Sequence, residues 1–125
     1  MASLSERIEA KINEGQLFRN PELTIKDVAT ELCTNRLYVS HAINTDFGMT
    51  FTQYINRKRI EYAIVLLTSY PMMRLNDVAT ESGLSSEKAL LRVFKKVMND
   101  SPRAYAKKII KEKAATKQNS VNYFD

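Results

Sequence analysis

The pentapeptide DVATE at Asp27–Glu31 recurs unchanged at Asp77–Glu81, fifty residues further along the chain. Around both copies, apolar residues stand at the spacing i, i+3, i+4, which places them on one face of a short helix. These residues are Ile25, Val28 and Ala29 in the first copy, continued by Leu32, and Leu75, Val78 and Ala79 in the second. An unchanged repeat predicts that one structural unit of about fifty residues occurs twice.

The segments that follow the two pentapeptides also correspond. A turn and the run Tyr38-Val39-x-x-x-Ile43 follow the first, and the turn Gly83-Leu84-Ser85 and the run Ala89-Leu90-x-x-x-Phe94 follow the second, at an offset of 51 residues. Gly48 and Asn99 occupy the next shared position, and both residue types tolerate the left-handed conformation that ends many helices. Each unit is therefore predicted to contain two short helices joined by a turn.

The second helix of each unit is predicted to be amphipathic. Asn35 is a candidate cap for the first of them. The residues expected to be buried are Val39, Ala42 and Ile43 in the first unit and Leu90, Val93, Phe94 and Val97 in the second. The residues expected to face outward are Arg36, Leu37, Ser40, His41 and Asn44 in the first unit and Glu87, Lys88, Leu91, Arg92 and Lys95 in the second.

Two short helices across a tight turn, the second with polar and basic residues outward, are typical of a helix-turn-helix. The second helix of this motif fits the major groove of DNA. For a single copy, an ordinary helical hairpin with a solvated polar face is an equal alternative. Two copies with the same outward chemistry favour the helix-turn-helix.

Residues 52–68, between the two units, show a nearly continuous helical pattern. Thr50 and Gln53 have the spacing of a capping box, and Pro71 blocks continuation past Tyr70. A helix of this extent is about 25 Å long at ~1.5 Å per residue. It can hold two recognition helices near the ~34 Å spacing of successive major grooves.

The charge of the chain is positive and lies toward its C-terminal end. The 125 residues include 19 Lys and Arg against 14 Asp and Glu, for a formal net charge of +5, and 44% of them are hydrophobic. After Gly83, ten residues are basic and four are acidic. A basic globular chain of this kind makes a polyanion the first partner to consider.

Several classes of protein are disfavoured by the composition. The single Cys33 cannot form an internal disulfide, and with the single His41 it cannot build a zinc finger, so we expect no metal and no cofactor. Motifs of nucleophilic, phosphate-binding and metal-dependent enzymes are missing, so we do not expect an enzyme. No run approaches the ~18 apolar residues of a membrane-spanning helix. We therefore expect a soluble, cytoplasmic protein that does not insert into a membrane.

Three motifs occur in order along the second half of the chain. They are Tyr54-Ile55-Asn56-Arg57-x-Arg59-Ile60-x-x-Ala63-x-x-Leu66-Leu67, then Asp77-Val78-Ala79-x-x-x-Gly83-Leu84-Ser85, then Arg92-Val93-Phe94-Lys95-Lys96 running on to Ser101-Pro102-x-x-Tyr105. With these motifs, the sequence resembles the DNA-binding domain of AraC/XylS-type transcription regulators over about residues 10–108. The resemblance implies that two helix-turn-helix subdomains, joined by a long helix, insert their recognition helices into adjacent major grooves of a bent site.

The fold expected from the repeat and the resemblance is all-α, with about seven helices. Residues 1–51 are expected to form the N-terminal helix-turn-helix subdomain, residues 52–69 the linking helix and residues 70–108 the C-terminal helix-turn-helix subdomain. Residues 109–125 are expected to be a basic C-terminal extension with no assigned role. The chain is expected to be part of a longer regulator with a sensor or dimerisation domain.

The residues expected to contact bases lie on the two recognition helices. Arg92 is the leading candidate, because an arginine side chain can bridge the O6 and N7 atoms of guanine, and Lys88 lies four residues before it on the same face. Leu91 has the chemistry to touch a thymine methyl group, and His41 is expected to be a neutral hydrogen-bonding contact. The complete set is Arg36, Leu37, Ser40, His41, Lys88, Leu91 and Arg92.

A second set is expected to contact the DNA backbone. It consists of Asn35, Asn44, Arg57, Ser86, Lys95, Lys96 and Arg103. For the lysines and Arg103 the alternative is ordinary surface charge. Asn35 and Ser86 are also candidate helix caps, a role that does not exclude a phosphate contact. Arg59, which is outside this set but close to Arg57, is expected either to touch the backbone or to pair with a glutamate. The aromatic residues Tyr38, Phe47, Phe51 and Tyr54 are expected to pack in the core, and Cys33 is expected to be a small buried hydrophobe.

The function expected from these features is sequence-specific binding of double-stranded DNA by a transcription regulator. The alternative is a protein-interaction module that uses the same fold to dock another regulator or RNA polymerase through Leu37 and Leu91. The two hypotheses differ in what they require of Arg92, which only DNA binding needs.

Overall fold

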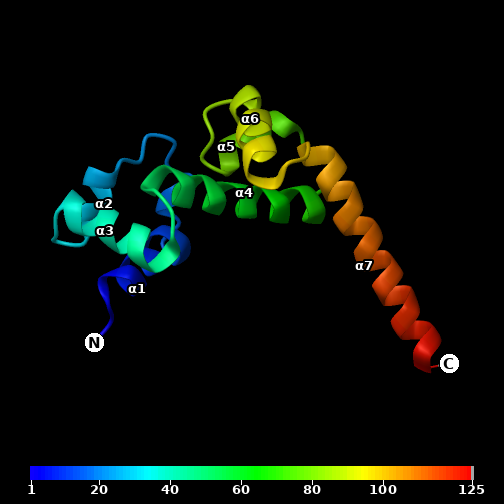
Figure 1. Cartoon of the computed structure of the whole chain (residues 1–125). Coiled ribbons are helices and arrows are strands. Elements are labelled where there is room, and N and C mark those ends of the chain that lie inside the picture. Colours follow the sequence, from blue (N-terminus) through cyan, green and yellow to red (C-terminus); the bar gives the residue numbers. More distant parts are fainter. Residues whose placement is uncertain (125) are drawn as a thin grey trace.

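The chain folds into helices, as a computed structural model shows for the backbone of residues 1–124 and for the side chains of residues 1–116 (Figure 1). The expected all-α class with about seven helices is confirmed. The elements are α1 (Leu4–Glu9), a π-helical turn η1 (Ala10–Glu14), a 3-10 turn η2 (Leu17–Arg19), α2 (Ile25–Glu31), α3 (Arg36–Phe47), α4 (Phe51–Ser69), α5 (Leu75–Glu81), α6 (Glu87–Met98) and α7 (Pro102–Phe124).

Side-chain caps begin helices α1, α2, α3, α4 and α6, whereas Arg74 before α5 makes no such bond. Thr24 and Thr50 form complete capping boxes with Asp27 and Gln53, at the starts of α2 and α4. A cap accepts a hydrogen bond from one of the otherwise unpaired backbone N–H groups at a helix start, and each cap stabilises the fold by about 1 kcal/mol. Both α3 and α6 end at a left-handed residue, Gly48 with φ of 67° and Asn99 with φ of 57°, as expected.

The buried side chains form two separate clusters, and α4 contributes to both. The first cluster consists of Ile8, Ile12, Phe18, Val28, Ala29, Leu32, Val39, Ala42, Ile43, Tyr54 and Ile55. The second consists of Ile60, Ala63, Leu67, Val78, Ala79, Leu84, Leu90, Val93, Phe94 and Ala106. In Figure 1, α1 to α3 accordingly gather at one end of α4 and α5 and α6 lie over the other. Each half of the chain thus packs on its own section of one shared helix.

The segment before α2 is part of the first core, although the sequence pattern assigned no helix to it. Ile8 on α1 and Ile12 on η1 are completely buried. Arg7 donates from Nη2 to the carbonyl oxygen of Leu32 at 2.9 Å, and Glu9 pairs with Lys58 of α4 at 2.7 Å. The N-terminal helix therefore braces both the helix-turn-helix and the linking helix.

Two predictions about single residues are wrong. Tyr38 is 63% exposed, because it lies in the first turn of α3 one residue before the buried Val39, beyond the edge of the apolar face. Cys33 is exposed rather than buried, and it holds the left-handed turn position after α2 with φ of 54°. Tyr54 does pack in the core as expected, with its ring stacked on that of Phe47 at 5.0 Å between centroids.

The C-terminal helix α7 continues from Pro102 to Phe124 and leads away from the two clusters (Figure 1). The expected extension at residues 109–125 is therefore, up to Phe124, a continuation of the helix that begins in the second half. Asp125 and the side chains of residues 117–125 lie outside the described part of the chain. None of the described helices is long and apolar enough to cross a membrane.

Candidate nucleic-acid interface

The first candidate surface is the outward side of α3. Asn35 starts this helix by accepting a hydrogen bond on Oδ1 from the backbone N–H of Tyr38 at 3.0 Å. The inward side is fixed by three buried residues, Val39, Ala42 and Ile43, as predicted. The residues predicted to face outward are all exposed, and they are Arg36, Leu37, Ser40, His41 and Asn44. Leu37 is 75% exposed, so its side chain is accessible to a partner.

The second candidate surface is the outward side of α6, which is built in the same way. Ser86 accepts a hydrogen bond on Oγ from the backbone N–H of Ala89 at 3.1 Å. Leu90, Val93 and Phe94 are buried beneath the helix. The exposed residues of the outward side are Glu87, Lys88, Leu91, Arg92, Lys95 and Lys96.

The two outward sides differ in charge, although they correspond position by position. At the offset of 51 residues, Ser40, His41 and Asn44 of α3 correspond to Leu91, Arg92 and Lys95 of α6. On α3, Arg36 is the one Lys or Arg of this set, whereas α6 presents four. The positive potential that attracts a polyanion therefore belongs mainly to α6.

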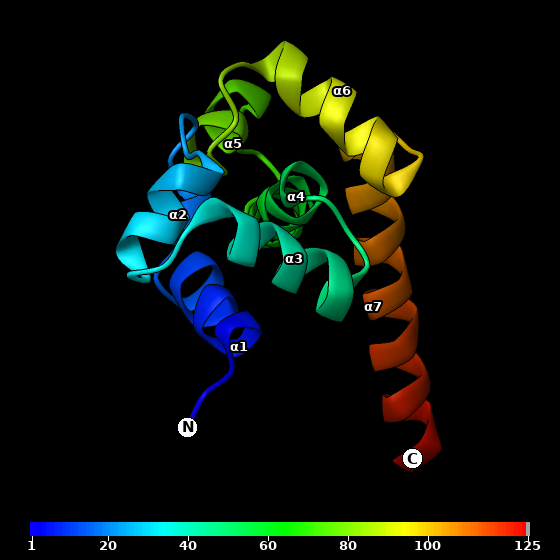
Figure 2. The same cartoon turned by 60° about the vertical axis from the view of Figure 1, so that its left-hand side comes forward.

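The two helices are also similarly placed on the molecule. In Figure 2, α3 and α6 run in the same general direction across the view, and neither is covered by another helix. The π-helical and 3-10 turns and α4 lie behind or beside them. The described part of the molecule thus offers two exposed, similarly directed helices, each with its apolar side held in a separate core.

Three arginines and lysines near these surfaces are engaged within the protein. Arg103 donates from Nη1 to the carbonyl oxygen of Pro71 at 3.0 Å and from Nη2 to that of Met73 at 2.6 Å. It therefore stabilises the α4–α5 loop, which the sequence did not indicate. Arg59 pairs with carbonyl oxygens instead of with a glutamate, and Lys58 pairs with Glu9.

The other candidates for backbone contacts remain exposed and free to reach a phosphate. Arg57 is exposed on α4, and Lys95 and Lys96 are exposed in the last turn of α6. Asn35 and Ser86 cap their helices, so the expected capping role is confirmed for both, and it does not exclude a phosphate contact. Whether any of these residues touches DNA stays a prediction.

Among the described residues, two titratable groups have pKa values shifted from their ordinary ones. The pKa of Asp100 lies below its ordinary value, first because the backbone N–H of Ser101 donates to its carboxylate at 2.8 Å. Lys108, at 3.4 Å, contributes in the same direction. The pKa of Arg59 is lowered by burial, which removes water from the guanidinium. Neither group lies among the predicted base contacts.

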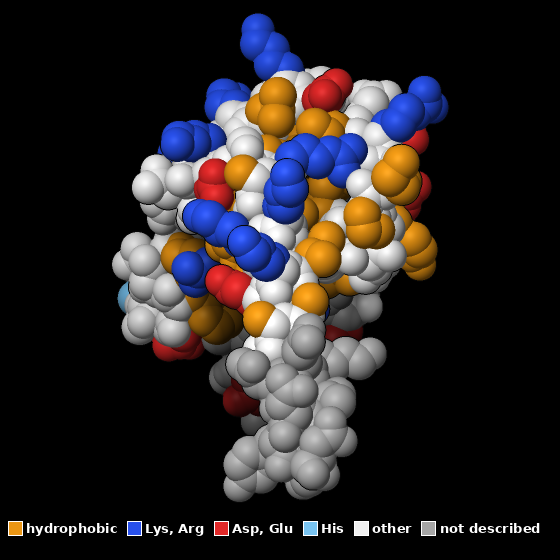
Figure 3. Space-filling view, turned by 90° about the vertical axis from the view of Figure 1, so that its right-hand side faces the viewer, with side chains coloured by type: hydrophobic (Ala, Val, Ile, Leu, Met, Phe, Trp, Pro, Cys, Tyr) orange, Lys and Arg blue, Asp and Glu red, His pale blue; other side chains and the backbone are white. Residues whose placement is uncertain are grey.

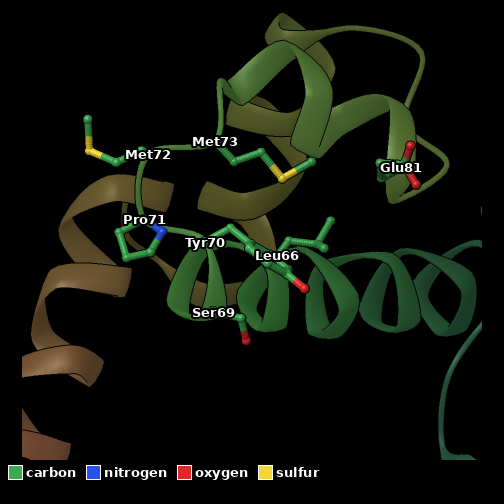
Figure 4. Close-up of a pocket in the computed structure, with 7 residues that line it drawn as sticks. All are labelled: Leu66, Ser69, Tyr70, Pro71, Met72, Met73 and Glu81. Atoms are coloured by element: carbon green, nitrogen blue, oxygen red, sulfur yellow. The ribbon is translucent and has the colours of Figure 1, made fainter.

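The described part of the chain also has a hollow of about 660 Å³ that lies apart from α3 and the outward side of α6. It is apolar and lined by Leu66, Ser69, Tyr70, Pro71, Met72, Met73 and Glu81. In Figure 4 the Met73 side chain extends over α4, and the Met72 side chain extends to the opposite side of the loop. On the face that carries α7, Figure 3 shows Lys and Arg side chains with exposed hydrophobic side chains between them.

The searched residues contain no group of three or more His, Cys, Asp and Glu that could hold a metal ion.

Comparison with known proteins agrees with this architecture. A family described as a helix-turn-helix domain matches residues 28–108. The TCP pilus virulence regulatory protein of Vibrio cholerae is 33% identical over 79 residues, which are 63% of this chain and 28% of that protein. An uncharacterized HTH-type transcriptional regulator of Staphylococcus aureus is 26% identical over 90 residues, 72% of this chain and 12% of that protein. The chain thus spans less than a third of the length of either relative.

Solved structures share the fold. The C-terminal domain of AraT, a response regulator from Geobacillus stearothermophilus, has a TM-score of 0.77 at 26% identity, and the match covers 86% of each chain. The DNA-binding domain of AdpA, a global transcriptional factor solved in complex with a target DNA, has a TM-score of 0.73 at 20% identity. That match covers 84% of this chain and 91% of the other, and it shows the fold alone.

Proposed function

The chain belongs to the AraC-type helix-turn-helix family of transcription regulators, and on this premise we propose that it binds double-stranded DNA with sequence specificity through α3 and α6. One observation carries the proposal. Two capped, amphipathic helices of corresponding sequence each bury one side in a separate core and leave polar, basic and apolar side chains exposed on the other. Each helix has the diameter that the major groove of B-DNA accepts.

The proposal assigns different tasks to the two helices. On α3, Arg36, Leu37, Ser40 and His41 read bases, since this side is nearly uncharged and its contacts depend on shape and hydrogen bonding. On α6, Lys88, Leu91 and Arg92 read bases, and Lys95 and Lys96 neutralise phosphates. Arg92 forms two parallel hydrogen bonds with guanine. Asn35, Asn44, Arg57 and Ser86 complete the set of backbone contacts, together with Arg103 through the guanidinium N–H groups that do not bond to Pro71 and Met73.

The two core clusters support the proposed division of the chain into subdomains. Residues 1–51 and 70–108 form the two helix-turn-helix subdomains, residues 52–69 link them and residues 109–125 form a basic extension. The proposed domain acts within a longer regulator that also has a sensor or dimerisation domain. RNA polymerase is a further candidate partner. Binding to the chromosome places this action in the cytoplasm.

Selection from a random pool of duplexes, followed by titration of the enriched sequence, tests the proposal. We expect an enriched motif with two half-sites, and we expect the logarithm of the affinity to fall linearly with the logarithm of salt concentration. The slope is about −0.9 for each phosphate neutralised. A shuffled duplex of the same length is the control. A pool that yields no motif, or affinity that does not respond to salt, contradicts the proposal.

A second candidate function is a protein-interaction module, and the 75% exposure of Leu37 favours it. In this alternative Leu37 and Leu91 dock another regulator or RNA polymerase, and DNA is not the partner of α6. The variant Arg92→Ala then retains regulatory activity in a reporter assay, whereas Leu37→Ala and Leu91→Ala lose it. Loss of activity with Arg92→Ala, together with loss of duplex binding in titration, contradicts the alternative.

A further inference from the structure

The 3-10 turn η2 lies directly against the turn of the second helix-turn-helix. The turn residue Gly83 has φ of +82°, and a Cβ atom on it would lie 2.4 Å from the carbonyl oxygen of Phe18 and 2.7 Å from Cα of Arg19. Cβ atoms do not come so close to backbone atoms, so the approach requires glycine. Cys33, the corresponding residue of the first unit, has a similar φ of 54° but is exposed. The close approach therefore distinguishes the second unit from the first.

Arg19 bonds across this contact to the end of α5. Its Nε donates to the carbonyl oxygen of Glu81 at 2.8 Å, and its Nη2 donates to Oε2 of Glu81 at 2.5 Å. Its guanidinium also lies 5.0 Å from the ring centroid of Tyr62 on α4. Among the described residues, these two bonds to Glu81 are the hydrogen bonds that join residues 1–51 to residues 70–108.

The turn that carries Arg19 is itself held on the linking helix. Arg59 of α4 donates from Nε to the carbonyl oxygen of Phe18 and from Nη2 to that of Asn20, both at 2.8 Å. The rings of Phe18 and Tyr62 meet edge to face at 5.5 Å between centroids. Arg59 of α4 thus bonds to η2, and Arg19 of η2 bonds to the end of α5. The second half of the chain, residues 70–108, is therefore attached to the first half, residues 1–51, at a point away from the axis of α4.

We propose that Arg19 is a latch that fixes the second helix-turn-helix relative to the first, and thereby sets the separation between half-sites that the domain accepts. The proposal rests on the proposed function, because only a protein that places two helices in one duplex measures such a separation. Without the latch, the halves stay joined through α4 and through the backbone contact of η2 with Gly83, but no hydrogen bond between described residues crosses from one half to the other. A small rotation of the second core about α4 then moves α6 relative to α3, because α6 lies off the helix axis.

The fold is expected to tolerate removal of the latch. The side chains of Arg19 and Glu81 are 35% and 47% exposed, and neither belongs to a core cluster. Exposed ion pairs contribute little to stability, so Arg19→Ala should unfold at nearly the temperature of the unchanged protein. The variant Arg19→Lys retains the charge but lacks the forked donors, and it should be intermediate in both measurements below.

Arg7→Ala is a matched control. Like Arg19, Arg7 donates from its guanidinium to a carbonyl oxygen at the end of a helix, that of Leu32 at 2.9 Å. This bond lies entirely within the first half. The control therefore removes an arginine–carbonyl bond without touching the contact between the halves.

The first measurement needs no DNA. Spin labels on the native Cys33 and on a cysteine introduced by Ser85→Cys report the distance between the two turns by pulsed electron paramagnetic resonance; both positions are exposed. We expect one narrow distance distribution for the unchanged protein and for Arg7→Ala, and at least a doubling of its width for Arg19→Ala. A distribution of unchanged width and mean for Arg19→Ala overturns the latch.

The second measurement titrates a panel of duplexes in which the half-site separation of the selected site changes one base pair at a time. We expect the unchanged protein and Arg7→Ala to lose at least tenfold in affinity one base pair from the optimum. We expect Arg19→Ala to bind the optimal duplex several-fold more weakly and to lose less than threefold on the neighbouring ones. If the distance distribution widens but the separation profile stays sharp, the role in spacing is overturned. If no variant, including the unchanged protein, selects a duplex, the proposed function fails, and the spin labels still decide the latch.

Discussion

Arg92 and Lys96 are both exposed on α6, but Arg92 is proposed to contact a base and Lys96 a phosphate. We expect Arg92→Ala to weaken binding to the selected duplex by about 1–3 kcal/mol and to relax the preference at one base pair, because a bidentate contact to guanine is lost. Lys96→Ala should weaken binding to all duplexes alike and reduce the salt slope by about 0.9. Fluorescence titration on a set of single-base variants of the site measures both.

Lys113, exposed on α7, supplies the control for these two variants. Its replacement by alanine should leave both affinity and base preference unchanged. Equal loss on every duplex for Arg92→Ala would assign Arg92 to the backbone and leave base reading on α6 to Lys88 and Leu91.

Asp100 should titrate below the ordinary range of an aspartate, because Ser101 and Lys108 favour its charged form. A group whose pKa is lowered by folding stabilises the native state above its unfolded pKa, and that contribution is lost as pH falls through the folded pKa. NMR titration of the Asp100 carboxyl carbon checks the direction. Lys108→Ala should raise the midpoint only part of the way, since the bond from Ser101 is the larger cause and stays. An ordinary midpoint in the unchanged protein contradicts this account.

Residue types with a local role were predictable from the sequence, and those with a long-range role were not. The caps Asn35 and Ser86 act on backbone groups three residues away, so their spacing carries the signal. Arg19 bonds to a residue 62 positions away, and Arg103 bonds to a loop 30 positions away, so no local pattern indicates either. Tyr38 was assigned wrongly, because an aromatic residue beside an apolar stripe reads as part of the core.

At the scale of elements, two glycines in the left-handed conformation allow two costs of substitution to be measured separately. One cost comes from the backbone conformation, and the other from the close approach of a neighbouring segment. Gly48 has φ of +67° with no atom within 4 Å of an added Cβ, whereas Gly83 has φ of +82° and faces the backbone of Phe18 and Arg19. We expect Gly48→Ala to cost about 1–2 kcal/mol, from the conformation alone. Gly83→Ala should cost a further ~1–3 kcal/mol, because η2 must move. Urea unfolding measures the loss of stability in both variants. Equal losses would show that η2 moves away from residue 83 at no cost in free energy.

Helices α2 to α6 were predictable, because periodicity is joined by the repeat for α2, α3, α5 and α6 and by a capping box for α4. The predicted linking helix at residues 52–68 differs from the observed Phe51–Ser69 by one residue at each end. The segment before α2 was not assigned. It has two buried isoleucines four residues apart, continues through a π-helical turn and ends in a three-residue 3-10 turn, so its pattern is too short to be distinctive.

At the scale of the whole molecule, α4 limits how far apart the two helix-turn-helix units stand. Its 19 residues span about 28 Å, which is less than the ~34 Å between successive major grooves on one side of straight DNA. We therefore expect the bound duplex to bend toward the protein. Energy transfer between dyes at the two ends of a selected duplex should rise on binding.

A duplex in which one half-site is scrambled is the control for bending, because a single inserted helix imposes no separation. It should show little change in energy transfer at saturating protein. Unchanged energy transfer on the intact site would mean that the two helices do not occupy adjacent grooves at once.

The N-terminal segment has a practical consequence for where such a domain can be cut. The matched family region begins at residue 28, yet Ile8, Ile12 and Phe18 fill the first core from positions before it. A fragment trimmed to the family limits would expose the inner sides of α2, α3 and α4 and would aggregate. A fusion of this module to a foreign sensor should keep residues 4–20, since their buried side chains pack beneath α2 and α3 in the first core.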